Sequence, residues 1–148
     1  MEAAVTAAQR GHSVTLYEKN SKLGGQIAHE QHIPFKKDMY HFIEVLAKRC
    51  EDAGVDIRLN TEVTPEEVAE MGADVVMTAV GAKPIIPQIP GIDNAKVTGL
   101  KALESEMPAV GQKVAILGGG LVGSEVAIYL DMIGKGCNSC GNEGYLGI

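Results

Sequence analysis

A glycine-rich turn between an apolar segment and a helical pattern constrains this chain more than any other feature. Residues 114–117 (VAIL) predict a short buried strand. Residues 118–123 (GGGLVG) follow directly with glycines in G-x-G-x-x-G spacing, and a helical pattern continues beyond them. Strand, glycine turn and helix in this order predict a Rossmann-like α/β unit, a three-layer fold around a parallel sheet.

Each of the three spaced glycines answers a separate steric demand. Gly118 permits the tight turn, Gly120 lets the backbone approach a pyrophosphate, and Gly123 lets the helix pack close to the strand. Unpaired amides at the positive end of the helix dipole would then face the phosphates. The spacing therefore predicts a dinucleotide site, and a bare structural turn is the alternative.

Length, charge and cysteine usage exclude several classes of protein. The 148 residues suffice for one ordinary domain, and the net charge of −6 without a basic cluster argues against nucleic acid as a partner. No apolar run approaches the roughly 20 residues that span a bilayer, and the N-terminus lacks the basic start of a signal peptide. Three cysteines do not make a disulfide scaffold, so we expect a cytoplasmic protein.

An internal repeat relates the N-terminus to the glycine turn. An offset of 123 residues places Glu125 on Glu2 and Gly134 on Gly11. A helix over residues 1–10 and a strand over 13–18 therefore form the end of a first strand–turn–helix–strand copy. The strand and glycines that begin this copy would precede Met1, so we expect an N-terminally truncated unit.

The same register demands a strand after the second helix. Residues 136–144 (GCNSCGNEG) have poor strand propensity, and Gly141 stands where the register requires an acid like Glu18. We therefore expect residues 136–148 to be an unrelated tail. The predicted domains are an incomplete first unit at 1–108, the start of a second at 109–135, and this tail.

Local patterns predict the elements between the two copies. An amphipathic helix covers 35–53, a strand 55–59, a helix begins at a Thr64 cap with Pro65 first, and a buried strand covers 72–81. The proline-rich segment 83–91 predicts an extended crossover, and 100–107 a short helix. The expected apolar face of the 35–53 helix consists of Met39, Phe42, Ile43, Leu46, Ala47 and Cys50.

Glu18 and a glycine pair are the candidate ligand contacts of the first copy. An acid about 20 residues past the glycines, at the tip of the second strand, accepts hydrogen bonds from adenosine ribose hydroxyls. Glu18 has this position in the repeat register, although a solvated strand-end acid is the alternative. Gly24 and Gly25 allow close backbone approach to a ligand, or form only a turn.

The C-x-x-C pair of Cys137 and Cys140 supplies half of a zinc site. A redox dithiol or a zinc-linked interaction fragment are its alternative interpretations. The four histidines have no metal-ligand companions at helical or loop spacing. No residue shows the pattern of a general acid, base or nucleophile, so we assign no catalytic side chain and no metal site.

Several segments together resemble the two-dinucleotide flavoproteins. They are residues 17–19 (YEK), 23–26 (LGGQ), 78–84 (TAVGAKP), 89–91 (IPG) and 118–125 (GGGLVGSE). The similarity is greatest to the C-terminal reductase portion of the 2,4-dienoyl-CoA reductase, 2-enoate reductase and trimethylamine dehydrogenase group. It implies an FAD-binding unit interrupted by an NAD(P)H-binding unit. FMN and an iron–sulfur cluster would belong to a barrel outside this sequence.

The resemblance also implies a set of cofactor-binding residues. Glu18 matches the acid that binds the FAD adenosine ribose, and Val63 the position whose backbone meets the adenine. The remaining positions divide between the loop that passes FAD (Lys19, Gly25, Gln26), the turn over the adenosine (Ala79, Gly81) and the NAD(P)H unit (Gly118, Gly120, Gly123, Glu125).

The activity implied by this resemblance is hydride transfer from NAD(P)H to FAD. The chain would then be the electron-input module of an enoate or dienoyl-CoA reductase-like enzyme. A non-catalytic nucleotide-binding fragment and a thioredoxin-reductase-like dithiol flavoprotein are the alternatives. Since the first glycine turn is missing, we expect residues 1–148 alone to bind FAD weakly and to self-associate through an exposed sheet edge, with no membrane partner.

Overall fold

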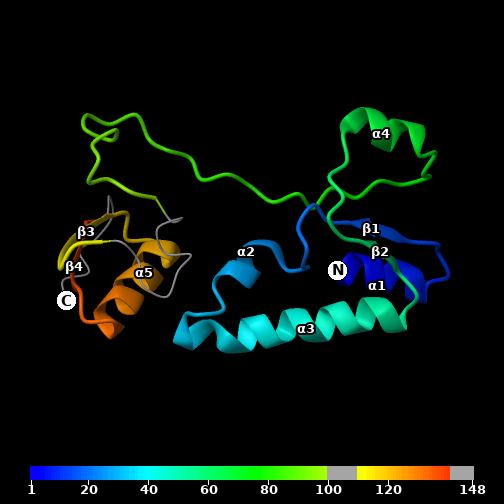
Figure 1. Cartoon of the computed structure of the whole chain (residues 1–148), viewed down its shortest axis with the longest axis horizontal. Helices are drawn as coiled ribbons and strands as arrows, with labels where there is room; N and C mark the ends of the chain where they lie inside the picture. Colours follow the sequence, from blue (N-terminus) through cyan, green and yellow to red (C-terminus); the bar gives the residue numbers. More distant parts are fainter. Residues whose placement is uncertain (100–109, 141–148) are drawn as a thin grey trace. The chain divides into compact units, whose positions relative to one another are not determined.

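The computed structural model describes residues 1–99 and 110–140, which belong to two compact units, Met1–Asn94 and Ala95–Ile148 (Figure 1). Within the described ranges each unit contains a two-stranded parallel sheet, with several helices in the first unit and one in the second. The α/β class is therefore confirmed. The expected helix over 100–107 and the expected boundary at 108/109 lie outside the described residues, so both stay predictions.

The first unit is a parallel strand pair joined through a long helix. Strands β1 (Thr15–Tyr17) and β2 (Asp56–Arg58) pair with Leu16 opposite Ile57. The chain between these strands contains α3 and is long enough to connect parallel strands, which need a crossover of a dozen residues or more. The helices of this unit are α1 (Glu2–Gln9), α2 (Gly25–His29), the 3-10 turn η1 (Pro34–Lys36), α3 (Lys37–Asp52) and α4 (Pro65–Glu70).

The core of the first unit consists of side chains from the helices α1 and α3 and from both strands. Val5 of α1 and Cys50 of α3 are fully buried, and Val55 joins them just before β2. The expected apolar face of α3 is confirmed at Ile43, Leu46 and Cys50, which are buried. It is wrong at Met39 and Phe42, which are 46% and 55% exposed. Within the described residues α3 packs on α1, α2, η1 and β2, and these contacts leave Met39 and Phe42 in solvent.

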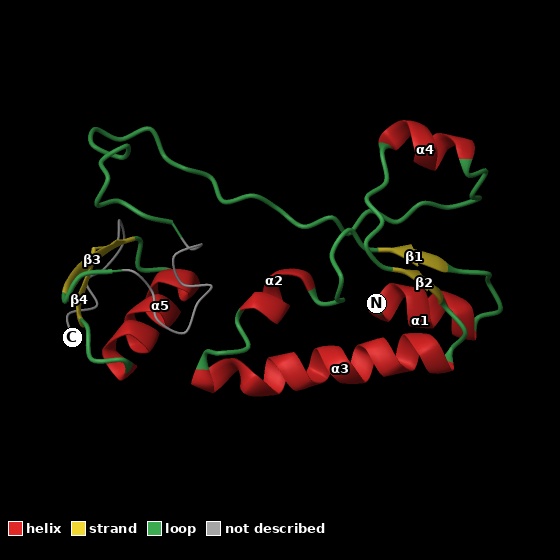
Figure 2. Cartoon of the chain, in the orientation of Figure 1, coloured by secondary structure: helices red, strands yellow, loops and turns green. Residues whose placement is uncertain are grey.

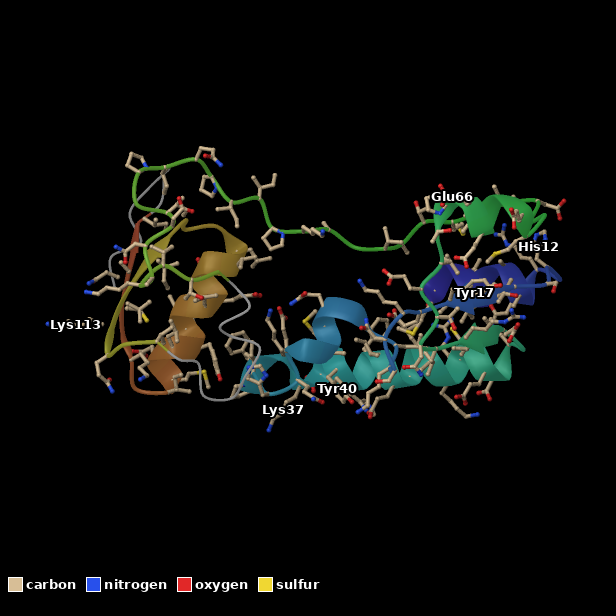
Figure 3. All side chains as sticks on the ribbon, turned by 45° about the horizontal axis from the view of Figure 1, so that its top comes forward. His12, Tyr17, Lys37, Tyr40, Glu66 and Lys113 are labelled. Carbon is tan, nitrogen blue, oxygen red and sulfur yellow. The ribbon has the colours of Figure 1, made fainter. Side chains whose placement is uncertain are left out.

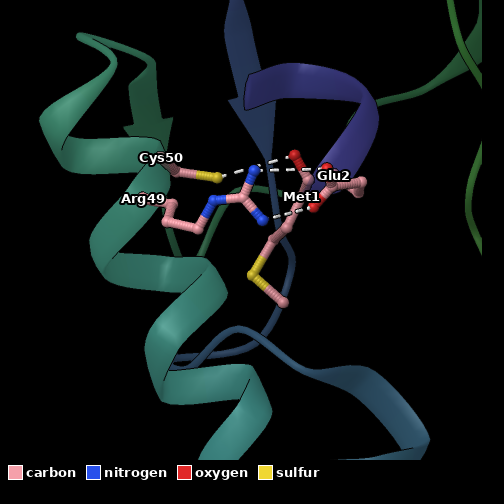
Figure 4. A network of polar contacts seen from close by, with 4 residues as sticks. All are labelled: Met1, Glu2, Arg49 and Cys50. Atoms are coloured by element: carbon pink, nitrogen blue, oxygen red, sulfur yellow. Dashed lines mark hydrogen bonds and ion pairs between the residues drawn. The ribbon is translucent and has the colours of Figure 1, made fainter. Parts of the chain in front are cut away.

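A polar network fastens α1 to α3 beside this core (Figure 4). The Arg49 guanidinium donates to both carboxylate oxygens of Glu2, at 2.9 and 3.3 Å, and the Cys50 Sγ lies 3.7 Å from the Met1 carbonyl oxygen. Both partners of the ion pair are partly exposed, so it contributes at most about 1 kcal/mol. The buried apolar contacts, rather than this pair, stabilise the helix packing.

Cys50 should make the first unit sensitive to alkaline pH. Burial is the main cause that raises the pKa of its thiol above the ordinary value of 9.0. The unfolded chain releases the proton more readily than the folded chain, so the stabilisation is complete below pH 9.0 and is lost as the pH rises through the folded-state pKa. We expect urea midpoints measured on either side of this pH to fall more in the parent than in Cys50→Ala. An equal fall of the urea midpoint with rising pH in the two proteins would contradict this expectation.

Two expectations on the segment after β2 have opposite outcomes. The start of α4 is confirmed as a capping box, in which Thr64 Oγ1 accepts from the Glu67 amide at 3.2 Å and Glu67 Oε2 from the Thr64 amide at 2.8 Å.

The buried strand predicted over 72–81 is wrong, since the structure there is a loop (Figure 2). Val75 is 78% and Val80 94% exposed. No described strand offers this segment a ladder partner, and an unpaired strand has no hydrogen bonds to hold it.

The second unit is a β–α–β crossover. Strands β3 (Lys113–Leu117) and β4 (Gly136–Cys140) run parallel, with Lys113 opposite Gly136 and Leu117 opposite Cys140. Helix α5 (Leu121–Met132) connects them and buries Ala127, Tyr129 and Leu130. The expectation that residues 136–140 would not form a strand is therefore wrong. Pairing with β3 outweighs a propensity scale that spans only about 1 kcal/mol.

The repeat register reappears in the hydrogen bonds that end α1 and α5. In the first unit the Gly11 amide donates to Ala8 and the His12 amide to Ala7, and in the second the Gly134 amide donates to Asp131 and the Lys135 amide to Leu130. Each bond is displaced by 123 residues. Both glycines have left-handed backbones, with φ of +90° and +78°. The two units therefore share one helix-to-strand corner.

Strand β3 is less buried than its apolar sequence suggests. Leu117 is 69% exposed, and burial alternates along the strand. Within the described part of the chain α5 covers one face of this sheet, so alternate side chains stay in solvent. No helix in that part is long and apolar enough to cross a membrane.

Candidate nucleotide-binding site

The turn from β3 to α5 has the geometry that the glycine spacing predicts. Gly118 has φ +110°, a conformation that favours glycine. A Cβ on Gly123 would overlap the carbonyl oxygen of Gly118, so this helix position approaches the strand end as closely as a glycine allows. These two residues build the turn, and neither tolerates a side chain.

Gly120 differs from its neighbours because it is not needed for the turn. It stands at the N-cap of α5 with an extended backbone (φ −73°, ψ −172°), and a Cβ placed on it would meet nothing within 4 Å. The absence of a side chain therefore leaves open space against the backbone at the start of a twelve-residue helix. The N-terminus of such a helix attracts phosphate, so these residues fit a dinucleotide pyrophosphate.

Ser124 and Glu125 complete the first turns of α5. The Ser124 amide donates to the Gly120 carbonyl at 3.0 Å, and its Oγ lies 3.4 Å from the Gly119 carbonyl oxygen. Glu125 is half-buried. The amide of Ser124 thus already has a partner inside the helix, whereas the amides of the first three helical residues have none there.

Glu18 directly follows β1 and is fixed by the two strands. Its amide donates to the Arg58 carbonyl and its carbonyl accepts from the Thr61 amide, both at 2.9 Å. Its carboxylate Oε1 accepts from the backbone amide and from Nδ2 of Asn20, each at 2.8 Å. An acid is therefore held at the carboxyl end of a parallel strand, where open α/β sheets bind their ligands.

A cation lies on the strand pair beside this acid. The Arg58 guanidinium lies 5.4 Å from the ring centroid of Tyr17, which Figure 3 labels on β1. The same group contacts the Asp56 carboxylate at 2.8 Å. Hydrogen bonding to Asp56, and then its charge, raises the pKa of Arg58. The positive charge of Arg58 is therefore engaged along the strands.

The other candidate residues of the first unit are only partly brought together. Lys19 continues from Glu18, and Val63 lies two residues past Thr61, so both belong to the same corner. Gly25 (φ +51°) and Gln26 begin α2 and are exposed. Ala79 and Gly81 lie in the unpaired segment after α4, and no described hydrogen bond joins them to the Glu18 corner.

Asn20 and Asn60 lie at the Glu18 corner but were not identified from the sequence. Asn20 donates to Glu18, and its carbonyl accepts from the Asn60 amide at 3.0 Å. Asn60 has φ +53°, which asparagine tolerates better than most side chains. The sequence feature that could have indicated them is an asparagine just after each strand end, because asparagine side chains commonly bond to nearby backbone groups in turns.

The Cys137 thiol of the C-x-x-C pair lies in surroundings that disfavour the thiolate. Burial, and then the charge of Asp131, raises the pKa of Cys137, which favours the neutral thiol. Among the side chains described, no group of three or more His, Cys, Asp or Glu residues could hold a metal ion. The nucleotide corners at Glu18 and at the β3–α5 turn are therefore the candidate sites.

Comparison with known proteins agrees with a nucleotide-binding oxidoreductase. Cinnamate reductase from Clostridium sporogenes is 44% identical over 135 residues, covering 91% of this chain and 20% of that protein. NADH oxidase from Thermoanaerobacter brockii is 37% identical over 134 residues, covering 88% and 21%. A solved structure of 2-naphthoyl-CoA reductase with 2-naphthoyl-CoA superposes with a TM-score of 0.81 at 33% identity, covering 93% and 21%.

This chain thus spans about a fifth of the length of these relatives. A family profile described as pyridine nucleotide-disulphide oxidoreductase matches residues 1–139 and so covers β4 except for Cys140. The family and these relatives are, by their names, oxidoreductases. The chain belongs to the pyridine nucleotide-disulphide oxidoreductase family.

Proposed function

We propose that the chain binds FAD and NAD(P)H and forms the electron-input module of an enoate or dienoyl-CoA reductase-like enzyme. When both cofactors are bound, the nicotinamide supplies hydride to the flavin, and the cofactors perform this chemistry themselves. The similarity to cinnamate reductase and to 2-naphthoyl-CoA reductase supports this assignment. FMN and an iron–sulfur cluster would lie in a part of the enzyme outside this sequence.

The contribution of this chain is to bind and orient. The open backbone at Gly120 would receive the NAD(P)H pyrophosphate on the first amides of α5, and this observation carries the proposal most directly. At the other corner the Glu18 carboxylate would accept a hydroxyl of the FAD adenosine ribose. Lys19, Gly25, Gln26 and Val63 would line the FAD path, and Ala79 and Gly81 the adenosine.

A non-catalytic nucleotide-binding role is the second candidate. It is favoured by the segment after α4, in which Ala79 and Gly81 make no described hydrogen bond to the FAD corner. A cytoplasmic location and self-association through a sheet edge stay predictions. Since we expect the chain alone to bind FAD weakly, the test titrates FAD into the purified chain. Saturable flavin binding would favour the enzyme module, and its absence with retained nicotinamide nucleotide binding would favour the second candidate.

Gly120→Ala should weaken NAD(P)H binding at least tenfold, about 1.4 kcal/mol. The new methyl group would occupy the space through which a pyrophosphate reaches the backbone, while nothing in the protein lies within 4 Å of it. The measurement is fluorescence titration with NADH and with NADPH, together with circular dichroism to verify the fold.

Ser124→Ala is the matched control, because it changes a neighbouring residue without altering phosphate-facing backbone. We expect it to bind both nucleotides nearly as the parent does. If Gly120→Ala also binds like the parent, the glycine turn has only a structural role and the proposed NAD(P)H site is wrong.

A further inference from the structure

The backbone of Glu18 is held more firmly than its side chain. Its amide and carbonyl are both bonded to the β2 side, through Arg58 and Thr61. A glutamate side chain nevertheless has three rotatable bonds, and ordering such a side chain on binding weakens affinity. A useful ribose acceptor at this position therefore requires something that fixes the carboxylate in advance.

Asn20 meets this requirement. It presents two donors to one oxygen, since its backbone amide and its Nδ2 both lie 2.8 Å from Glu18 Oε1. The backbone of Asn20 is itself held in place, because its carbonyl accepts a hydrogen bond from the Asn60 amide at 3.0 Å. The carboxylate is thus linked to both strand ends, through its own backbone and through Asn20.

The two oxygens of Glu18 consequently differ. Oε1 receives both Asn20 donors, whereas Oε2 makes no hydrogen bond within the described ranges. An ionised carboxylate has about four acceptor sites, so Oε2 keeps its full accepting capacity. We propose that Asn20 is a positioning residue that fixes Glu18 so that Oε2 accepts a hydroxyl of the adenosine ribose. This inference rests on the ribose role proposed for Glu18.

The test compares two probes that differ only in the ribose hydroxyls, adenosine 5′-monophosphate and its 2′,3′-dideoxy analogue. Binding is followed on the full chain by NMR, from the amide signals of Glu18 and Thr61. These signals report on this corner and exclude nucleotide bound at the β3–α5 turn. We expect the parent to prefer the hydroxylated probe about tenfold.

Asn20→Ala should reduce this preference to about twofold by weakening only the hydroxylated probe, because the dideoxy analogue offers Glu18 no hydroxyl. Asn20→Ser keeps a side-chain donor and should retain most of the preference. Ser21→Ala, the next exposed loop residue, should retain it in full. A general loosening of the loop would weaken both probes equally, which the comparison detects.

Two results overturn the inference in different ways. If the parent shows the preference and Asn20→Ala retains it fully, or weakens both probes equally, the Asn20 side chain does not position Glu18 while the ribose role of Glu18 stands. If the parent shows no preference, or neither probe shifts the Glu18 and Thr61 signals, the ribose role fails and this inference fails with it.

Discussion

Gly123→Ala is expected to unfold the second compact unit. The added Cβ would overlap the carbonyl oxygen of Gly118, and both partners are backbone that no rotamer change can move. Overpacking against movable side chains costs about 1–3 kcal/mol, so a backbone overlap should cost at least about 3 kcal/mol. The separation of α5 from the end of β3 would remove the crossover that holds the strand pair.

Hydrogen exchange of the α5 amides measures this effect within the affected unit. Protection at Ala127–Leu130, the buried part of the helix, should fall to the level of unfolded chain in Gly123→Ala. Gly120→Ala is the control, because its new methyl group meets no atom and its backbone suits alanine. Equal protection of α5 in the two variants would contradict the close approach of Gly123 to the turn.

Gly24→Ala should destabilise the first unit by about 3 kcal/mol. Gly24 has φ +115°, outside the regions that alanine occupies readily. Its Cβ would also lie 2.8 Å from Cδ1 and 2.9 Å from Cγ2 of Ile43, which is only 6% exposed. Backbone strain and crowding of a buried side chain therefore add together, and urea unfolding followed by circular dichroism measures their sum.

Gly25→Ala separates these two causes. Gly25 also has a left-handed backbone (φ +51°), but a Cβ on it would meet nothing within 4 Å, so we expect only about 1 kcal/mol. Ile43→Ala should also reduce the added cost of Gly24→Ala, since it removes the crowded atoms. If both glycine variants cost the same, or Ile43→Ala gives no relief, the packing of Gly24 on α3 is wrong.

The sequence by itself determined the features that depend on neighbouring residues. The spacing of Gly118, Gly120 and Gly123 predicted the turn, because a left-handed backbone and a close approach each need glycine at one position. The Thr64 cap needed only the next three residues to form its box. The repeat register predicted the shared corner at Gly11 and Gly134 for the same reason, since these bonds close within a few residues.

Pairing and burial were decided by the tertiary structure. Residues 136–140 form a strand despite poor propensity because β3 provides a parallel partner, whereas residues 75–80 have strong propensity but find no described partner and stay exposed. The hydrogen bond from the Asn60 amide to the Asn20 carbonyl also needed the pairing of β1 with β2, because these two residues are distant in sequence. A strand is stabilised by hydrogen bonds to residues distant in sequence, so its own composition cannot specify whether it forms.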